Sequence, residues 1–316
     1  MSGTALFLWV TSIVLAGLVA VTFLFYRNEL GRAYEAVRRG SQIANTDAGS
    51  IEYAERGAGI PLLSIHGAGG GFDQGLALAA ESVGDGFRII APSRFGYLRT
   101  PVPQDTSPAA QAAAHAALLC KLNVSKAIVL GASAGARSAI EFALRYPDMV
   151  ASLILIAPGT YWPARPAALE GNRSIRFIFW VVNAGGNFLW WTAEKIAPSM
   201  LIRFLGVPPE LVTAALSADR DRVMSIVRSV EPLSLRFPGI NVDSTAVLNE
   251  LPLGKITAPT LIISTPDDGF NTLPAAKFAA SKIINAKLVV YDTGGHLLVG
   301  QQNAVRTTVR SFVSST

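Results

Sequence analysis

A serine flanked by glycines stands near the middle of the chain, in Gly131-Ala132-Ser133-Ala134-Gly135. It follows a short apolar run, residues 127–130, and opens a helix-like stretch, residues 136–146. A tight strand-to-helix turn forces such a serine into a strained backbone conformation and lifts its hydroxyl out of the sheet. Glycine is needed on both sides because a Cβ there would collide with the neighbouring strand and helix. The pattern predicts that Ser133 is a nucleophile.

Serine chemistry also needs a base that takes the hydroxyl proton and an acid that orients the base. His296 ends a glycine-rich loop that follows a strand-like run, residues 286–291, and precedes a final amphipathic helix. The acid is expected after the preceding strand, where residues 260–264 run into Asp267 and Asp268. Either aspartate fits this argument. The order serine, aspartate, histidine differs from the chymotrypsin and subtilisin orders.

The two other histidines have different surroundings. His66 follows a buried strand, residues 62–65, and precedes a run of glycines whose backbone N–H groups can converge on a developing negative charge. We expect His66 to shape this loop, because a better-placed base already exists. His115 lies in an alanine-rich stretch, residues 109–120, without a partner motif, and is expected to be an ordinary helix residue.

Together these motifs resemble the α/β-hydrolase superfamily over residues 50–313. The resemblance rests on five features: the loop at His66-Gly67, the loop from Ser93 to Tyr97, the serine turn, the Asp-Asp turn and the terminal Gly-Gly-His. It implies an α/β-hydrolase fold with a mostly parallel sheet, helices on both faces and an inserted helical lid.

The resemblance also bears on the choice of acid. In similar proteins the acid takes the fourth position of a G-x-x-D turn, and placing Thr265 at the glycine position points to Asp268 rather than Asp267. Ser93 and Arg94 stand where many relatives carry aspartate and a small residue, so the chain departs from the common pattern there. These departures leave the subfamily open and remove no catalytic group.

The implied activity is that of a serine hydrolase acting on carboxylic esters or related acyl compounds. Ser133 would attack the carbonyl, His296 would carry the proton and Asp268 would fix His296. The backbone N–H groups of Ala68 and Ala134 would hold the oxyanion, with Gly69 as an alternative donor. No metal or organic cofactor is expected. Serine at the turn argues against relatives that open epoxides or remove halide, because those use aspartate there.

Several alternatives use the same three side chains. Hydrolysis of carbon–carbon bonds, lactone opening, acyl transfer and cofactor-free perhydrolysis are each compatible with them. A different class of alternative is a non-catalytic hydrolase-like protein that binds a ligand or partner at a membrane. It is disfavoured because binding alone gives no reason to keep all these motifs together.

The amino-terminal segment, residues 4–26, contains no charged residue. As a helix with a rise of about 1.5 Å per residue it is long enough to cross a hydrocarbon core of roughly 30 Å. We therefore predict a single transmembrane anchor. A cleaved signal peptide is the alternative, but a basic leading region and a clear cleavage site are both missing. Four arginines follow the segment closely and favour a cytoplasmic catalytic domain: Arg27, Arg32, Arg38 and Arg39.

The whole chain, 316 residues of which 50% are hydrophobic, is long enough for one α/β domain with an inserted lid. The predicted division is an anchor at 4–26, a basic juxtamembrane linker at 27–49, a core at 50–158 and 254–316, and a helical lid at 159–253. The net charge of +5 favours an anionic membrane surface, and no nucleic-acid-binding motif is visible. The single cysteine, Cys120, excludes an intrachain disulfide.

The predicted strands and lid complete this interpretation. Short apolar runs separated by helical stretches are typical of a sheet covered on both faces. The expected strands are residues 50–55, 60–65, 87–91, 127–130, 152–156, 259–264 and 287–291, with a helix at 106–122. Aromatic residues cluster in the lid, at Tyr161, Trp162, Phe177, Phe179, Trp180, Phe188, Trp190, Trp191 and Phe204. They form lid core, an acyl-binding pocket or a contact with the bilayer, and each version predicts a small substrate of apolar character.

Overall fold

The computed structural model describes residues 2–163 and 186–316 and is built on one eight-stranded sheet. The strand order is β1-β2-β4-β3-β5-β6-β7-β8. The β1–β2 and β2–β4 pairs are antiparallel, and the other pairs are parallel, which confirms the predicted mostly parallel sheet. The bounds are β1 (Gln42–Thr46), β2 (Gly49–Arg56), β3 (Ile60–Ile65), β4 (Phe87–Pro92), β5 (Ala127–Ala132), β6 (Val150–Ile156), β7 (Thr260–Ser264) and β8 (Ala286–Val290).

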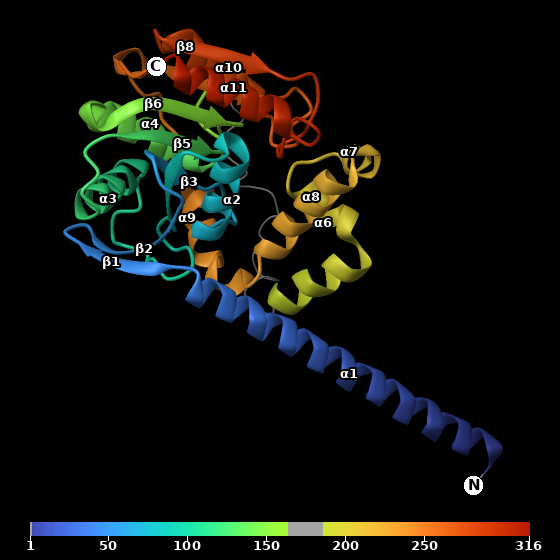
Figure 1. Ribbon diagram of the computed structural model, residues 1–316. Coiled ribbons are helices and arrows are strands. Elements are labelled where there is room, and N and C mark those ends of the chain that lie inside the picture. Colours follow the sequence, from blue (N-terminus) through green and yellow to red (C-terminus); the bar gives the residue numbers. More distant parts are fainter. Residues whose placement is uncertain (1, 164–185) are drawn as a thin grey trace.

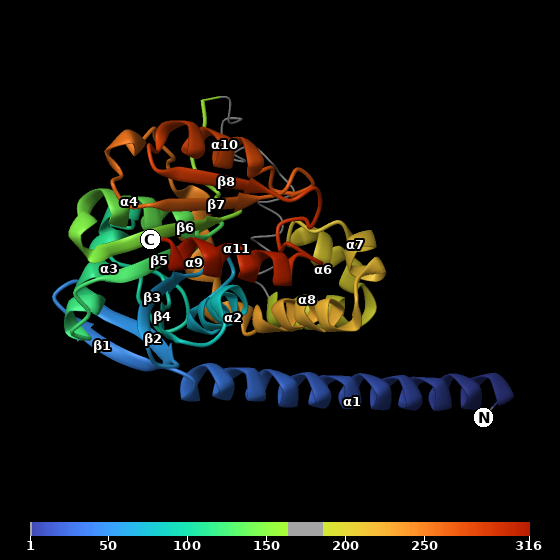
Figure 2. The same ribbon diagram turned by 45° about the horizontal axis from the view of Figure 1, so that its top comes forward.

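Helices cover both faces of the sheet, as the near-continuous apolar strands require. On one face lie α3 (Pro108–Lys121), α4 (Gly135–Arg145) and α10 (Leu273–Lys282). On the other lie α2 (Phe72–Val83) and α11 (Gln302–Ser314) (Figure 2). Each layer has its own buried apolar cluster. The sheet is therefore rigid, and the loops at the carboxyl ends of its parallel strands are held in fixed positions.

A helical insertion separates β6 from β7 and occupies the range expected for the lid. Its described part contains helical residues 186–196, α6 (Pro198–Phe204), α7 (Pro209–Ala214), α8 (Ser217–Ser229) and α9 (Phe237–Thr245), with short 3-10 turns at Leu233–Leu235 and Leu253–Lys255. The insertion has an apolar core of its own, in which the Trp190 indole N–H donates to the Val227 carbonyl at 3.0 Å. The aromatic residues expected at 177, 179 and 180 lie outside the described residues.

The amino-terminal helix α1 (Gly3–Arg39) is one continuous helix of 37 residues. Its apolar window has a mean hydropathy of 2.3 and no buried residue, so the helix is long and apolar enough to span a membrane. It projects from the domain with its amino-terminal end far from every other element (Figure 1).

The linker expected at residues 27–49 is instead ordered secondary structure. The helix α1 continues to Arg39, and residues 42–46 form β1, which pairs with β2. Val37 packs into a buried cluster with Ala54, Phe72 and Ala91. This contact fixes the end of α1 against the sheet, and the charged sequence pattern of the segment gives no sign of it.

Candidate active site

The serine turn lies at the carboxyl end of β5, where the chain enters α4. Ser133 has φ of +50°, a left-handed conformation that costs energy in any residue with a side chain. A Cβ at Gly131 would lie 2.6 Å from the Ala139 Cβ, and one at Gly135 would lie 2.4 Å from the His66 carbonyl oxygen. Close packing against α4 and β3 therefore requires both glycines, and it leaves the Ser133 side chain partly exposed at the sheet edge.

Asp268 and His296 meet at the same edge of the sheet, in the loops that follow β7 and β8. The Nδ1 of His296 lies 2.9 Å from the Oδ2 of Asp268. Asp268 also accepts hydrogen bonds from the Phe270 backbone N–H at 2.8 Å and from the Thr272 hydroxyl. Burial favours a higher pKa for Asp268, but the bonds from His296, Thr272 and Phe270 outweigh it and lower the pKa below its usual value. Asp268 is therefore a carboxylate at neutral pH, directed at the imidazole.

Asp267 points to a different part of the same loop. Its carboxylate accepts hydrogen bonds from the Thr293 hydroxyl at 2.5 Å and from the backbone N–H groups of Gly294 and Gly295 at 3.1 and 2.9 Å. It holds the backbone just before His296 and makes no contact with the ring. The structure thus gives the two adjacent aspartates separate partners.

No hydrogen bond joins the Ser133 hydroxyl to His296 within residues 2–163 and 186–316. Such bonds are often long in enzymes without substrate and tighten when it binds. The position of His296 is fixed by two other contacts. Its backbone N–H donates to the Gly206 carbonyl at 3.0 Å, and the Phe270 ring meets its imidazole edge to face at 4.7 Å.

The loop after β3 passes directly over Ser133. A Cβ at Gly67 would lie 3.1 Å from the Ser133 Cβ. In the described part of the chain, the backbone N–H groups of Ala68 and Ala134 have no hydrogen-bond acceptor. The N–H of Gly69, in contrast, donates to the Tyr97 hydroxyl at 3.3 Å. Ala68 and Ala134 are thus available to an oxyanion, whereas Gly69 already has an acceptor.

His66 shapes this loop, as expected. Its Nε2 accepts from the Arg94 backbone N–H at 3.0 Å, so its Nδ1–H is free to donate to the Gly67 carbonyl at 2.7 Å. Burial, reinforced by the positive charge of Arg94, holds the pKa of His66 well below its usual value, and the ring is neutral. Because the Gly67 carbonyl and the Ala68 N–H share one planar peptide unit, the bond to Gly67 also fixes the direction of the Ala68 N–H.

A buried carboxylate from the insertion supports the same loop, and no sequence motif predicts it. Asp243 of α9 accepts from both terminal nitrogens of Arg94, at 2.7 and 2.6 Å, and from the Tyr97 hydroxyl at 2.5 Å. The Nε of Arg94 in turn donates to the His66 carbonyl at 2.9 Å. Burial favours a higher pKa for Asp243, but Arg94 overcomes this effect and lowers it. Arg94 was visible in the sequence only as a departure from the common pattern.

A second buried arginine lies beside the same loop. Arg236, which is fully buried, binds the carboxylate of Asp73 through two bonds of 3.1 and 2.7 Å. A Cβ at Gly71 would lie 2.7 Å from one of its terminal nitrogens. Both arginines next to the loop are therefore neutralised by an aspartate.

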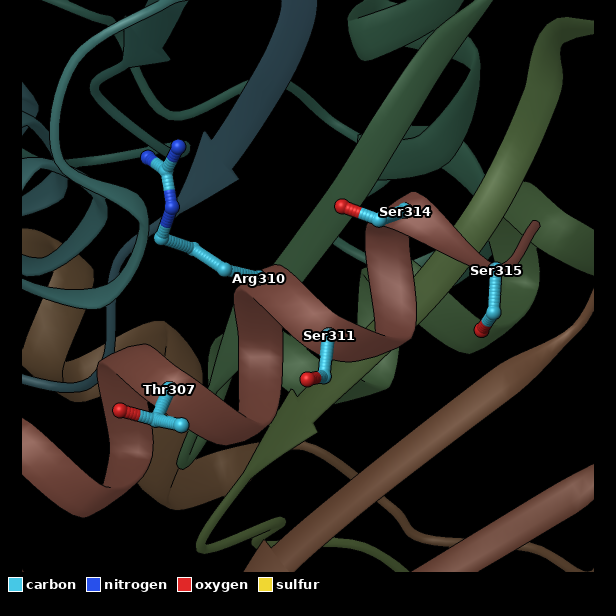
Figure 3. A pocket seen from close by; sticks show the side chains of 5 residues that line it. All are labelled: Thr307, Arg310, Ser311, Ser314 and Ser315. Carbon is cyan, nitrogen blue, oxygen red and sulfur yellow. The ribbon is translucent and has the colours of Figure 1, made fainter.

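A separate hollow lies on α11, away from these residues (Figure 3). It is lined by Thr307, Arg310, Ser311, Ser314 and Ser315. The Arg310 guanidinium donates to the carbonyls of Val83 and Asp85, which is a structural role. The hollow contains no acid and no histidine to activate its hydroxyls. In the described ranges, no group of three or more histidine, cysteine, aspartate or glutamate side chains is arranged to hold a metal ion.

Comparison with known proteins agrees with the fold. The family described as alpha/beta hydrolase fold matches residues 60–301. The uncharacterized hydrolase YcgS of Bacillus subtilis (strain 168) is 26% identical over 281 residues, 86% of this chain and 96% of that protein. A 2-hydroxy-6-oxononadienedioate/2-hydroxy-6-oxononatrienedioate hydrolase of Paraburkholderia xenovorans (strain LB400) is 25% identical over 263 residues, 78% of this chain and 84% of that protein.

Among solved structures, an alpha/beta hydrolase fold protein from Nakamurella multipartita superimposes with a TM-score of 0.67 at 29% identity. The match covers 86% of this chain and 98% of that one. The family match extends over most of the chain and includes the serine turn, both aspartates and His296. The chain therefore belongs to the alpha/beta hydrolase fold family.

Proposed function

We propose that this protein is a serine hydrolase that cleaves carboxylic esters through an acyl-enzyme. Ser133 is the nucleophile, His296 the general base and Asp268 the residue that orients His296. The observation that carries the proposal is the 2.9 Å contact between His296 Nδ1 and Asp268 Oδ2, at the sheet edge that also presents Ser133 with its strained backbone. A strained serine next to an oriented imidazole is typical of nucleophilic catalysis.

In the first half of the reaction, the Ser133 Oγ attacks the ester carbonyl carbon. Its proton passes to the Nε2 of His296, while the Nδ1–H of the resulting imidazolium donates to Asp268. The carbonyl oxygen becomes an oxyanion that accepts from the N–H groups of Ala68 and Ala134. The carbon–oxygen bond to the alcohol then breaks, and the alcohol leaves with the proton from His296.

In the second half, His296 removes a proton from water, and the hydroxide attacks the acyl carbon. The same two N–H groups hold the second oxyanion. The bond to Ser133 breaks, and Ser133 recovers its proton from His296 as the carboxylic acid leaves. Asp268 and His296 thus act in both halves, and each ends the reaction in the protonation state in which it began.

Two features beside the site suit a neutral acyl group. The guanidinium groups of Arg94 and Arg236 are each paired with an aspartate through two hydrogen bonds, so neither is free to bind a substrate carboxylate. The Phe270 ring, which is half exposed, covers one edge of His296 and offers an apolar contact.

We also propose that the apolar part of α1, residues 4–26, anchors the protein in a membrane with the catalytic domain on the cytoplasmic side. The length and hydropathy of the helix, and the arginines that follow it, support this placement. The full chain should stay with membranes during extraction with alkaline carbonate. Its release into the supernatant with residues 4–26 still attached would contradict the anchor.

A fluorophosphonate probe tests the catalytic proposal. The wild type should form a covalent adduct, whereas Ser133→Ala should form none and lose at least about a thousandfold in ester turnover. Ser138→Ala is the matched control, because Ser138 lies in α4, where its hydroxyl is bonded to the Gly135 carbonyl and to the Nε2 of His115 and not to Asp268 or His296. Equal labelling of the wild type and Ser133→Ala would refute the proposed nucleophile.

Cleavage of carbon–carbon bonds is the second candidate, because the relative from Paraburkholderia xenovorans is named for hydrolysis of a 2-hydroxy-6-oxo dienedioate. The same serine, histidine and aspartate would serve. The acidic substrates of that reaction need a cation in the site. Arg94 and Arg236 do not provide it, because each is bound to an aspartate. Turnover of a 2-hydroxy-6-oxo dienoate faster than that of neutral esters would favour this alternative.

A further inference from the structure

The insertion carries a concentration of exposed apolar side chains. The described residues outside α1 have thirteen large apolar side chains that are exposed. Five of them lie within residues 188–204, and the other eight are spread over the rest of the described ranges. The five are Phe188, Leu189, Ile196, Met200 and Phe204, here called the apolar face of the insertion. Leu189 and Ile196 are seven residues apart on one helix, and Met200 and Phe204 are four apart on α6, so each pair shares a side.

This face adjoins the membrane-exit end of α1 at Phe188. The Tyr26 ring meets the rings of Phe188 and Trp191 at 5.1 and 5.7 Å. Three residues later, Glu29 accepts from the Trp191 indole N–H at 2.7 Å and pairs with Lys195 at 3.0 Å. In both views α1 continues past the insertion with nothing else beside it (Figures 1 and 2).

Two properties of the contact suit a lipid interface. Aromatic rings gather at the end of the uncharged segment, where tyrosine and tryptophan sit in membrane proteins. The charged side chains of residues 188–204 are Glu194, which is buried, and the cations Lys195 and Arg203. Lys195 pairs with Glu29 and Glu194, whereas Arg203 is exposed. An apolar face with an exposed cation suits an anionic bilayer. A soluble partner protein would have to compete with the bilayer that the anchor already brings to this position.

The same segment leads into the candidate active site. Two residues after Phe204, the Gly206 carbonyl accepts from the backbone N–H groups of His296 and Gly269, at 3.0 and 2.9 Å. Phe270, whose ring lies against His296, is exposed next to this junction. An acyl chain at Phe204 would therefore lie two residues from Gly206, which packs beside the Phe270 ring that contacts the imidazole.

We propose that the apolar face of the insertion rests on the bilayer and that the substrate is a membrane-resident lipid ester, drawn from the bilayer beside Phe204. This inference rests on the proposed ester hydrolysis and anchor, and it adds the surface through which substrate arrives. It places the entrance to the site at the membrane and not in free solution.

Site-specific fluorescence in the full chain tests the surface independently of activity. With Cys120→Ser as background, Ile196→Cys and Ile284→Cys are labelled with an environment-sensitive dye and reconstituted in phosphatidylcholine and phosphatidylglycerol vesicles. Ile196 and Ile284 are 78% and 80% exposed, and Ile284 lies between α10 and β8, so it is a matched control. The dye at 196 should shift to the blue and be quenched by spin-labelled lipid, and the dye at 284 should do neither.

Two outcomes would overturn the inference. Equal quenching by aqueous iodide at both positions would show that the face lies in water. Protection from iodide at 196 without quenching by lipid would show that a second copy of the chain, and not the bilayer, covers it.

A second experiment tests the route of the substrate with Ile196→Glu, and Ile284→Glu is its control. The rate on a long-chain ester embedded in vesicles should fall by about tenfold for Ile196→Glu alone, while the rate on a short soluble ester stays unchanged. Equal rates on the embedded ester would refute entry through this face. Absence of hydrolysis of either ester by the wild type would instead refute the proposed function and leave the fluorescence result standing.

Discussion

The candidate catalytic edge of the sheet and the apolar face of the insertion use side chains in opposite ways. At the edge, buried charges are paired: Asp268 with His296, Asp243 with Arg94 and Asp73 with Arg236. On the face, large apolar side chains remain exposed, and the contact with α1 is made by rings and by one ion pair. Rigid, preorganised polar groups stabilise a developing charge, whereas exposed apolar surface is retained where a partner covers it.

The two regions are nevertheless joined by the insertion itself. Its helix α9 reaches this edge through Asp243, which binds Arg94. Gly206, two residues after α6, accepts from the His296 backbone N–H. One inserted segment therefore both supports the loop that carries Ala68 and carries the apolar face. Substitutions can separate these two contributions.

The largest effect is expected at the aspartate that contacts the imidazole. Asp268→Asn should lower turnover by roughly a thousandfold, because an amide N–H opposite Nδ1 favours the wrong tautomer of His296. Asp267→Asn should cost far less, because this side chain has no hydrogen bond to the ring and the amide oxygen can still accept from the Thr293 hydroxyl and the Gly294 N–H, which share one oxygen of Asp267. Steady-state kinetics on a soluble ester measure both. The reverse ranking would assign the orienting role to Asp267.

A smaller effect is expected where the insertion supports the catalytic edge. Asp243→Asn weakens the pair with Arg94, so the loop that carries Ala68 loses support, and kcat should fall by about tenfold to a hundredfold with little change in KM. The unfolding temperature should fall as well, because Arg94 keeps a buried charge without its counterion. Asp221→Asn, an exposed change on α8, is the control. If Asp243→Asn lowers the unfolding temperature but not kcat, Asp243 has only a structural role.

The smallest effect is expected in the pH dependence of stability, at the junction of α1 and the insertion. Burial, with repulsion from Glu194 and Glu29 that Lys195 partly offsets, raises the pKa of Glu231 to about 7. Because the pKa is raised, the folded state favours protonated Glu231. The stability that this protonation contributes is complete below the unfolded pKa of about 4.5 and is lost as pH rises through 7. Water reaches Glu29 and Lys195, so the effect is moderated by solvent.

Glu231→Gln should remove this dependence. Relative to the variant, the wild type should lose about 2 to 4 °C in unfolding temperature between pH 5 and pH 8. Thermal unfolding of the full chain in detergent at both pH values gives the comparison. Parallel changes in the two proteins would show that Glu231 does not titrate in this range.

The sequence predicted the parts of the molecule that depend on short-range pattern. The Gly131 to Gly135 turn is local, since each glycine is needed for packing next to Ser133, and the apolar runs of the parallel strands are continuous. The choice between Gly69 and Ala68 depended on the Tyr97 hydroxyl, which comes from another loop.

Other features could not be predicted from the sequence, because they also depend on contacts between residues far apart in the chain. Asp243 and Arg94 are 149 positions apart, and no motif links them. The continuation of α1 through the expected linker depends on the burial of Val37 against Ala54 and Phe72, which the charged pattern of that segment does not reveal. Long-range pairing and contacts with the insertion thus required the structure.

Trapping of the acyl-enzyme tests the central claim most directly. During rapid-quench turnover of a p-nitrophenyl ester, the account predicts a burst of nitrophenol equal to the enzyme concentration and a mass increase of one acyl group on the peptide that contains Ser133. Ser133→Ala should show neither. Steady hydrolysis by the wild type without an acylated Ser133, or acylation of another residue, would contradict the account.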